Sequence, residues 1–367
     1  MEEKETIQEE TVQTVKKESF FKRKDIEISA KRYLQDALSA MALGLFASLL
    51  IGVILDTIGV QTANLFGENA VSAFLIEVGA QAKAYMGAAI GVAVAWGLKA
   101  PPFVIFTSVV TGMMGATMTG FGIDVAGGPA GAFVAVALGV EFGKMVSKET
   151  KVDILVTPAV TLVVGAIGAK LIGPAIGWCM LRLGDLIMTA TEWQPFIFGI
   201  VISVVVGLAL TAPISSAALC IMLDLSGLAA GAATVGCCAQ MVGFAVASYR
   251  ENGVGGLVAQ GIGTSMLQIS NIFKNPWILV PATLAGAIIG PLSTCVFQMT
   301  NIAVGAGMGT SGLVGQIGTF TDMGFTLDTL WKVLLLQIIL PAVVTLIIDR
   351  LLRKAGKIKD GDYKLEM

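Results

Sequence analysis

The chain has 367 residues, of which 55% are hydrophobic and only 14% are charged, and its mean hydropathy is +0.81. Soluble domains carry about 25% charged residues, so this composition excludes an ordinary soluble domain and predicts an all-α polytopic membrane protein. The formal net charge is −2 and histidine is absent. Catalysis by a histidine base is therefore excluded, and the basic residues, which share the tails with many acidic ones, do not indicate nucleic-acid binding.

The two ends of the chain are predicted to lie in the cytoplasm. Met1 to Lys31 is dense in charges of both signs and is predicted to be a cytosolic tail, disordered at its start and then amphipathic. Lysines and arginines flank both the first and the last apolar run, and such flanks stay cytoplasmic. We therefore expect an even number of spans, with a tail at 1–35, a transmembrane domain at 36–352 and a tail at 353–367.

Long apolar runs predict ten transmembrane helices. A bilayer core about 30 Å thick needs roughly 20 apolar residues per helix, and the 44 glycines favour close packing of helices in lipid. The predicted spans are 36–56, 83–99, 102–122, 129–146, 153–173, 197–212, 214–236, 240–266, 276–296 and 330–349.

Two segments do not fit simple spans, Pro174 to Trp193 and Val296 to Asp328. The second contains seven glycines with polar residues scattered among them. Irregular backbone at membrane depth persists only where it is buried in protein or lines a wet cavity. The segment from Val296 to Asp328 is therefore predicted to be re-entrant or broken.

An apolar phrase occurs twice, each time after a connector that contains lysine. "ILVTPAVTLVVGAIGAKLIGP" spans Ile154 to Pro174, and "ILVPATLAGAIIGP" spans Ile278 to Pro291. Further landmarks recur in the same order, which predicts an internal repeat with copies at about 85–192 and 194–310. Internal repeats are common in transporters. The copies are parallel if both connectors face the cytoplasm, and inverted otherwise.

One set of polar residues recurs at helical spacing. Gln260, Thr264, Gln268 and Asn271 are separated by four, four and three residues, which would place them on one face of a helix. Such a stripe either lines a hydrated path for a small polar solute or joins helices together.

The glycine-rich segment supplies a second set of neutral polar groups, which suits an uncharged solute such as a sugar or a polyol. These candidates are Gln298, Asn301, Thr310, Ser311, Gln316 and Thr319. Ser215 and Ser216 could contribute from the other side. Asp224 is the candidate carboxylate for coupling to a proton or cation; otherwise it is a solvated residue at the end of a span.

Catalytic and cofactor motifs are not found in the sequence. The five cysteines lie in apolar surroundings without metal or redox spacing, and there is no P-loop and no G-x-S-x-G motif. We therefore expect a protein that is not an enzyme and that needs neither a metal nor a cofactor.

Three stretches resemble the membrane-embedded EIIC component of bacterial sugar phosphotransferase systems, and more closely the PfoR-type toxin-regulator membrane proteins. They are "TAPISSAAL" from Thr211, "GGLVAQGIGTSMLQISNIFKNPWILVPAT" from Gly255 and "GTSGLVGQIGTF" from Gly309. The resemblance implies a sugar-transporter-like fold, a homodimer and a location in a bacterial cytoplasmic membrane.

The chain also departs from that family. Glucose-type EIIC proteins use a histidine and a glutamate of a "G-I-T-E-P"-like motif near the sugar, and this chain has neither the motif nor a histidine. The favoured function is a transporter of a small polar solute without coupling to phosphorylation. The alternative is a membrane-embedded solute sensor that signals through a cytosolic partner of the N-terminal tail. A transporter would work without that tail, whereas a sensor would lose its signal.

Overall fold

A computed structural model of the chain describes residues 20–365 except 121 and 213–214. The start of the predicted N-terminal tail and Pro213 of the "TAPISSAAL" motif thus lie outside the described residues. The described part is built almost entirely from helices, with one short β-hairpin, β1 (Thr119–Gly120) and β2 (Ile123–Ala126). This confirms an all-α membrane architecture.

Six helices of the described part are long and apolar enough to cross a membrane. They are Lys31–Phe66, α8 (Gly128–Val146), α9 (Asp153–Leu171), α13 (Gly227–Ala247), Pro276–Val296 and Leu327–Lys354. α5 (Ala70–Ala84) and α6 (Met86–Gly97) are bent by 51° and make a seventh span if they count as one. α7 (Pro102–Thr117) and α11 (Pro195–Thr211) are apolar but shorter. The chain is a multi-pass membrane protein, and the number ten remains a prediction.

Three of the spans are continuous but contain π-helical or 3₁₀ turns. Lys31–Phe66 consists of η1 (Lys31–Ala37), α3 (Leu38–Leu45), η2 (Phe46–Leu50) and α4 (Ile51–Phe66). Pro276–Val296 consists of η5 (Pro276–Leu279), α16 (Val280–Pro291) and η6 (Leu292–Val296). Leu327–Lys354 consists of α19 (Leu327–Val333), η8 (Leu334–Ile339) and α20 (Leu340–Lys354).

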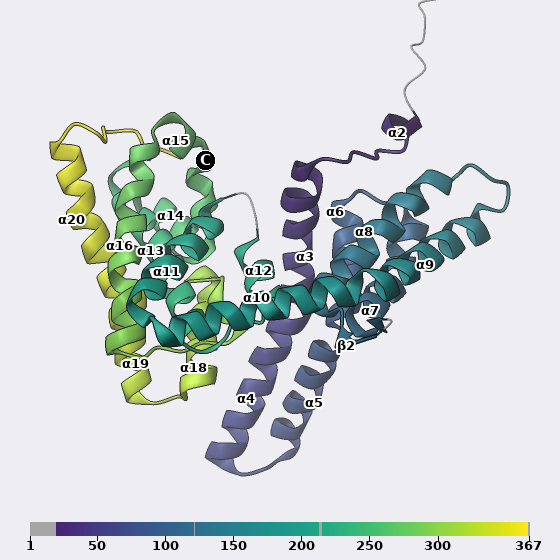
Figure 1. The fold of residues 1–367 in the computed structure, drawn as a ribbon. Coiled ribbons are helices and arrows are strands. Elements are labelled where there is room, and N and C mark those ends of the chain that lie inside the picture. Colours follow the sequence, from purple (N-terminus) through teal and green to yellow (C-terminus); the bar gives the residue numbers. More distant parts are fainter. Residues whose placement is uncertain (1–19, 121, 213–214, 366–367) are drawn as a thin grey trace, which may run out of the picture.

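The first helix is longer than the predicted span at 36–56. Its 36 residues extend about 54 Å at 1.5 Å per residue, well beyond a bilayer core of about 30 Å. Its second half, α4, pairs with α5 in a hairpin that projects away from the rest of the molecule (Figure 1). Asn69 begins α5 by accepting the Val71 and Ser72 backbone N–H groups at 3.0 Å. The hairpin is absent from the prediction because polar residues interrupt the apolar runs there.

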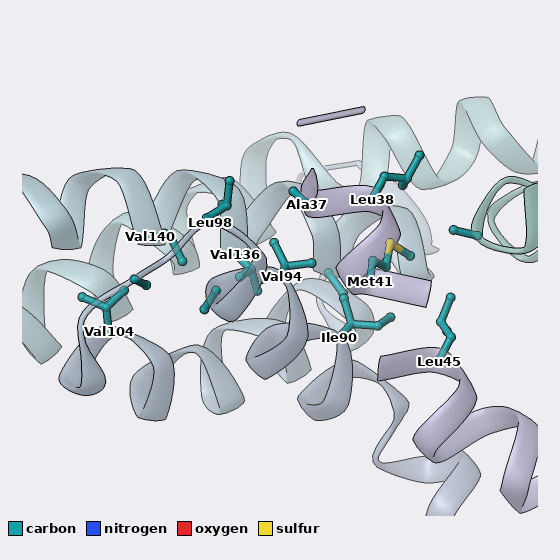
Figure 2. Packing of buried hydrophobic residues seen from close by; sticks show 14 of the residues in the cluster. Ala37, Leu38, Met41, Leu45, Ile90, Val94, Leu98, Val104, Val136 and Val140 are labelled. Atoms are coloured by element: carbon teal, nitrogen blue, oxygen red, sulfur yellow. The ribbon is translucent and has the colours of Figure 1, made fainter. Parts of the chain in front are cut away.

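The first half of the chain forms a bundle of α3 with α6, α7, α8 and α9. Its core is made of buried aliphatic side chains, and Figure 2 shows Met41 and Leu45 of α3 beside Ile90 and Val94 of α6. α6 and α7 approach closely, because a Cβ at Gly112 would clash with the Gly87 carbonyl. Small residues at this contact therefore allow the two backbones to touch, as is common between membrane helices.

The second half forms another bundle from α11, α13, α16 and α20. A Cβ at Gly236 of α13 would clash with the Ser203 carbonyl of α11. The predicted spans at 214–236 and 240–266 are wrong, because α13 continues from Gly227 to Ala247 through the predicted boundary. In the most apolar window of α13, 94% of the residues are buried inside the protein. Hydropathy consequently does not mark the ends of this helix.

α10 (Gly173–Trp193) joins the two bundles. Figure 1 shows this teal helix running between the two groups at a steep angle to α3 and α20. The segment from Pro174 to Trp193 was predicted not to fit a simple span. It forms a helix, but this helix is not among those long and apolar enough to cross a membrane. Close to its middle, a Cβ at Gly184 would clash with the Leu223 carbonyl.

The two lysine-containing connectors lie on one side of the molecule. Glu149, in the connector before α9, pairs with Arg23 at 2.8 Å. Asn275, in the connector before α16, donates to the Lys357 carbonyl at 2.9 Å. Figure 1 places α2 (Phe20–Arg23) and the C-terminal end at the same side. α9 and α16, which carry the repeated phrase, therefore start from the same face; the internal repeat itself remains a prediction.

Short elements lie between the long helices. They are α12 (Ser216–Met222), α14 (Tyr249–Val258), η3 (Ala259–Gly263), η4 (Ser265–Gln268), α15 (Ile269–Lys274), α17 (Ala303–Ala306), η7 (Ser311–Leu313) and α18 (Val314–Met323).

Candidate solute site

The chain turns back on itself after α13. α14 and η3 lead to Thr264, where the backbone is extended (φ −160°, ψ 142°), and η4 and α15 then lead away. The predicted single helical face for Gln260 to Asn271 is therefore wrong, because Thr264 interrupts the helix. The extended residue lies at the tip of a broken segment, which we call the first tip (residues 259–266).

The glycine-rich segment is broken into short helices, as predicted. It contains α17, η7 and α18, and its bend (residues 307–313), here called the second tip, includes three residues with left-handed backbone. Gly309 (φ 54°) is the most constrained of them, because a Cβ there would also lie 2.7 Å from the Cys237 backbone. Only glycine combines this φ with such a close approach.

The two tips are joined by side-chain hydroxyls. Thr310 Oγ1 donates to the Gly261 carbonyl at 2.5 Å, and Ser311 Oγ donates to the Gly263 carbonyl at 2.9 Å. These carbonyls belong to a turn that ends at an extended residue, where regular helical bonding stops. The hydroxyls of the second tip thus satisfy the backbone of the first.

A hollow of about 180 Å³ lies where both tips meet α3 and the start of α12. Four of the predicted site residues line it together: Ser215, Ser216, Thr264 and Ser311. Most of the remaining wall is apolar and comes from α3, η2, Leu210 and Met308. Small-molecule sites combine such apolar walls with a few placed polar groups.

The four hydroxyls differ in what they leave available to a solute. Ser216 Oγ donates to the Gly307 carbonyl at 2.7 Å and Ser311 Oγ donates to Gly263, so both oxygens remain free to accept. Ser215 Oγ accepts from the Ala218 N–H and Thr264 Oγ1 from the Met266 N–H, each at 3.2 Å. The O–H groups of Ser215 and Thr264 make no hydrogen bond to any other described residue and remain free to donate.

The rest of the predicted polar stripe binds the C-terminal segment. Gln268 Nε2 donates to Gln260 Oε1 at 2.9 Å and to the Tyr363 carbonyl at 3.0 Å. Asn271 Nδ2 donates to Gln268 Oε1 at 2.8 Å and to the Lys364 carbonyl at 2.9 Å. The stripe was expected either to line a hydrated path or to join helices together. The hydrogen bonds of Gln268 and Asn271 correspond to the second role, because they join segments of the protein.

The remaining candidates from the glycine-rich segment are separated from the hollow. Asn301 is fully buried and donates to Thr234 Oγ1 at 2.6 Å and to the Gly315 carbonyl at 3.0 Å. Gln316 donates to Gln337 Oε1 at 2.9 Å, and Gln337 in turn donates to Thr319 Oγ1 at 3.0 Å. Gln298 is exposed, in a left-handed turn (φ 46°). The bonds of Asn301 and Gln316 hold the broken segment against α13 and η8.

Asp224 lies at the C-terminal end of α12, the short helix whose N-terminal end carries Ser215 and Ser216. It is exposed, and its backbone is left-handed (φ 49°). The position fits either role considered for it, a coupling carboxylate or a solvated residue at a helix end.

Two parts of this region were not predicted from the sequence. Ser39 lines the hollow from α3, and a hydroxyl in the otherwise apolar run after Ala37 was the available signal. Behind Thr264, Thr211 Oγ1 lies 2.8 Å from Ser265 Oγ and donates to Gln240 Oε1 at 3.3 Å. Thr211 is the first residue of the "TAPISSAAL" motif, but its hydrogen-bond partners are distant in sequence.

Multiple membrane helices, two broken segments that meet at their tips and a neutral hollow beside them are typical of membrane transporters. The family model described as "Phosphotransferase system, EIIC" matches residues 35–365. The chain belongs to this EIIC family. A comparison with curated proteins found no match. The expected EIIC resemblance is thus confirmed, and the closer relation to PfoR-type proteins remains a prediction.

Proposed function

We propose that this protein transports a small, uncharged polar solute, a sugar or a related compound, and that the solute binds in the hollow between the two tips and α3. The single observation that carries the proposal is the convergence of Ser215, Ser216, Thr264 and Ser311 on that hollow. The described residues around it include no charged side chain. A sugar hydroxyl both donates and accepts hydrogen bonds, and the hollow offers both kinds of group.

The proposed transport is not coupled to phosphorylation, and the solute leaves chemically unchanged. The chain lacks histidine and the "G-I-T-E-P"-like motif of glucose-type EIIC proteins. Transport then proceeds by facilitated diffusion or by coupling to an ion. The same proposal includes a location in a bacterial cytoplasmic membrane, a homodimer surrounded by lipid, and cytoplasmic ends, as the resemblance to EIIC proteins implies.

Removing the hydroxyl of Thr264, which is free to donate, or that of Ser311, whose oxygen is free to accept, should weaken solute binding. Thr264→Val and Ser311→Ala each remove one hydrogen-bonding group, which is worth about 1–1.5 kcal/mol and corresponds to a loss of affinity of about tenfold. The measurement is the thermal melt of the purified protein against a panel of monosaccharides, disaccharides and polyols, followed by titration of the compounds that stabilise it.

The matched control for that experiment is Thr62→Val. Thr62 lies on α4 outside the hollow, and its hydroxyl donates to the Ile58 carbonyl of its own helix at 2.7 Å. This variant should keep the affinity of the original protein. Equal affinities for all three variants would place the solute elsewhere.

For ion coupling, Asp224 is the proposed carboxylate, because α12 connects it to the hydroxyls of the hollow. Asp224→Asn is expected to abolish the dependence of solute uptake on an imposed proton or sodium gradient in proteoliposomes. Solute affinity in the thermal melt should stay within about twofold, since Asp224 does not line the hollow. Uptake that still follows the gradient would remove Asp224 from the mechanism.

The second candidate function is a solute sensor, and one observation favours it. The last part of the predicted tail is held against the end of α8: Arg23 pairs with Glu149 at 2.8 Å, and Lys144 Nζ donates to the Asp25 carbonyl at 3.0 Å. A change in the bundle would therefore reach the tail directly, and a cytosolic partner bound to the tail would receive it.

A further inference from the structure

A strongly basic hollow lies where the N-terminal segment meets the ends of α6 and α8. Its volume is about 460 Å³, and it is separate from the solute hollow. Five cationic side chains line it against two carboxylates. The cations are Arg23, Lys24, Lys99, Lys144 and Lys148, and the carboxylates are Asp25 and Glu149.

Only some of these cationic side chains form salt bridges within the protein. Arg23 and Lys24 share Glu149, at 2.8 and 2.5 Å, and a hydrogen bond from Lys24 lowers the pKa of that carboxyl. The side chains of Lys99 and Lys148 make no salt bridge or hydrogen bond to any described residue, although both line the hollow. Two ammonium groups are thus available to an anion.

The backbone at these two lysines is unusual. Lys99 (φ 55°) follows α6 and Lys148 (φ 61°) follows α8 by two residues, both in the left-handed conformation that normally selects glycine after a helix. Asp25, on the same hollow, is also left-handed (φ 52°). Residues held in such conformations cluster at ligand sites, and here the lysines place charge at positions where glycine would fit without strain.

The walls of the basic hollow are held in place by Arg32. Arg32 is 4% exposed, and its Nη2 donates to the Asp25 carboxylate at 2.6 Å and to the Leu98 carbonyl at 2.7 Å. Leu98 directly precedes Lys99. The N-terminal segment and the end of α6 are therefore fixed relative to each other before any ligand binds.

We propose that this basic hollow binds a phosphate group, either on a soluble phosphorylated compound or on a lipid headgroup. A phosphate presents several strong acceptor oxygens and negative charge. These match an excess of cations in which the side chains of Lys99 and Lys148 make no salt bridge or hydrogen bond to a described residue. The cations come from the N-terminal segment and from the ends of α6 and α8, so a bound phosphate bridges the tail and the first bundle.

The test uses the full chain in phosphatidylcholine nanodiscs, with inorganic phosphate as the probe and sodium chloride of equal ionic strength as the reference. Phosphate should raise the melting temperature of the original protein in a saturable manner. Lys99→Gly and Lys148→Gly should each weaken the apparent phosphate affinity about tenfold or more, the loss expected for a charge-assisted hydrogen bond.

Glycine is the informative replacement, because it removes the charge and also suits the left-handed backbone. Without phosphate, both variants should therefore melt at the same temperature as the original protein or higher, which separates lost binding from misfolding. The matched control is Lys151→Ala, which removes an exposed cation of the same connector that does not line the hollow. This control should keep the phosphate affinity.

A second arm separates the two sources of phosphate. If a headgroup occupies the site, nanodiscs that contain phosphatidic acid should stabilise the original protein more than the glycine variants, and added inorganic phosphate should then have little effect. If a soluble compound occupies it, the effect of inorganic phosphate should persist in those nanodiscs. The proposal is overturned if phosphate and phosphatidic acid both act no differently from chloride and phosphatidylcholine, or if both glycine variants keep the original affinity.

Discussion

Ser39→Phe is expected to abolish solute transport while leaving the protein folded. Ser39 is half-buried on α3 and faces a hollow of only about 180 Å³, so a phenyl ring would occupy much of the space that the solute needs. Sites for drug-sized ligands are typically about 300–1,000 Å³, and a site smaller than these has little spare volume. Uptake of the stabilising sugar or polyol into proteoliposomes should fall below about a tenth of the original rate.

The control for steric block is Ser39→Ala, which removes the hydroxyl without filling the space. Unlike Ser311 and Ser216, Ser39 makes no hydrogen bond to a carbonyl of either tip. The Ser39→Ala variant should therefore retain most of the transport. The melting temperature of Ser39→Phe reports whether the ring is accommodated. Transport by a folded Ser39→Phe protein at the original rate would contradict a solute path through this hollow.

Tyr363→Ala is expected to destabilise the second bundle by about 3–5 kcal/mol, the usual effect of removing a large buried ring. Tyr363 is fully buried although it is the fifth residue from the end of the sequence. Its ring packs edge-to-face against Phe244 at 6.2 Å, and its hydroxyl donates to Asp349 Oδ1 at 3.0 Å. Burial raises the pKa of Tyr363 well above its usual range, so the phenol remains a donor throughout the physiological range.

The measurement is thermal or chemical unfolding of the purified protein, together with limited proteolysis of the C-terminal segment. Tyr363→Phe is the matched control: it keeps the ring and should lose only about 1 kcal/mol with the hydroxyl. An unchanged melt for Tyr363→Ala would show that the C-terminal segment is not part of the folded bundle. In that case Gln268 and Asn271 would lack their hydrogen bonds to the Tyr363 and Lys364 carbonyls and could face a hydrated path.

The Ser39 and Tyr363 variants test two parts of the predicted polar stripe. Ser39 faces the hollow that Thr264 lines, and Tyr363 belongs to the segment that Gln268 and Asn271 bind. Gln260, Thr264, Gln268 and Asn271 have helical spacing, but Thr264 is extended and lines the hollow, whereas the three amides form a hydrogen-bonded chain beside the C-terminal segment. Spacing alone could not separate them, because the break at Thr264 depends on contacts with the second tip. Thr310 and Ser311, which make those contacts, are more than 45 residues away.

Ser215, Ser216 and Ser311 illustrate what short motifs could predict. Each was proposed from its place beside proline or glycine in an apolar region, and the structure brings all three to one hollow. Ser39 was not proposed, because nothing in the first apolar run indicates which neighbour its hydroxyl will face. The contribution of α3 to the hollow therefore depends on how the first bundle packs against the two tips.

The sequence by itself determined the environment and the kinds of helix. Few charges, long apolar runs and many glycines require a membrane and closely packed helices, since buried backbone must be hydrogen-bonded and small residues let helices touch. α8, α9 and the helix Pro276–Val296 begin and end within two residues of their predictions, because their ends coincide with proline, glycine or charged connectors.

Tertiary structure decided the rest. α13 extends through a predicted boundary because protein, not lipid, surrounds it. The tips, the solute hollow and the buried C-terminal segment all depend on hydrogen bonds between residues far apart in the chain. Such bonds gain their strength from burial, and which groups become buried together is settled only when the two bundles and α10 pack against one another.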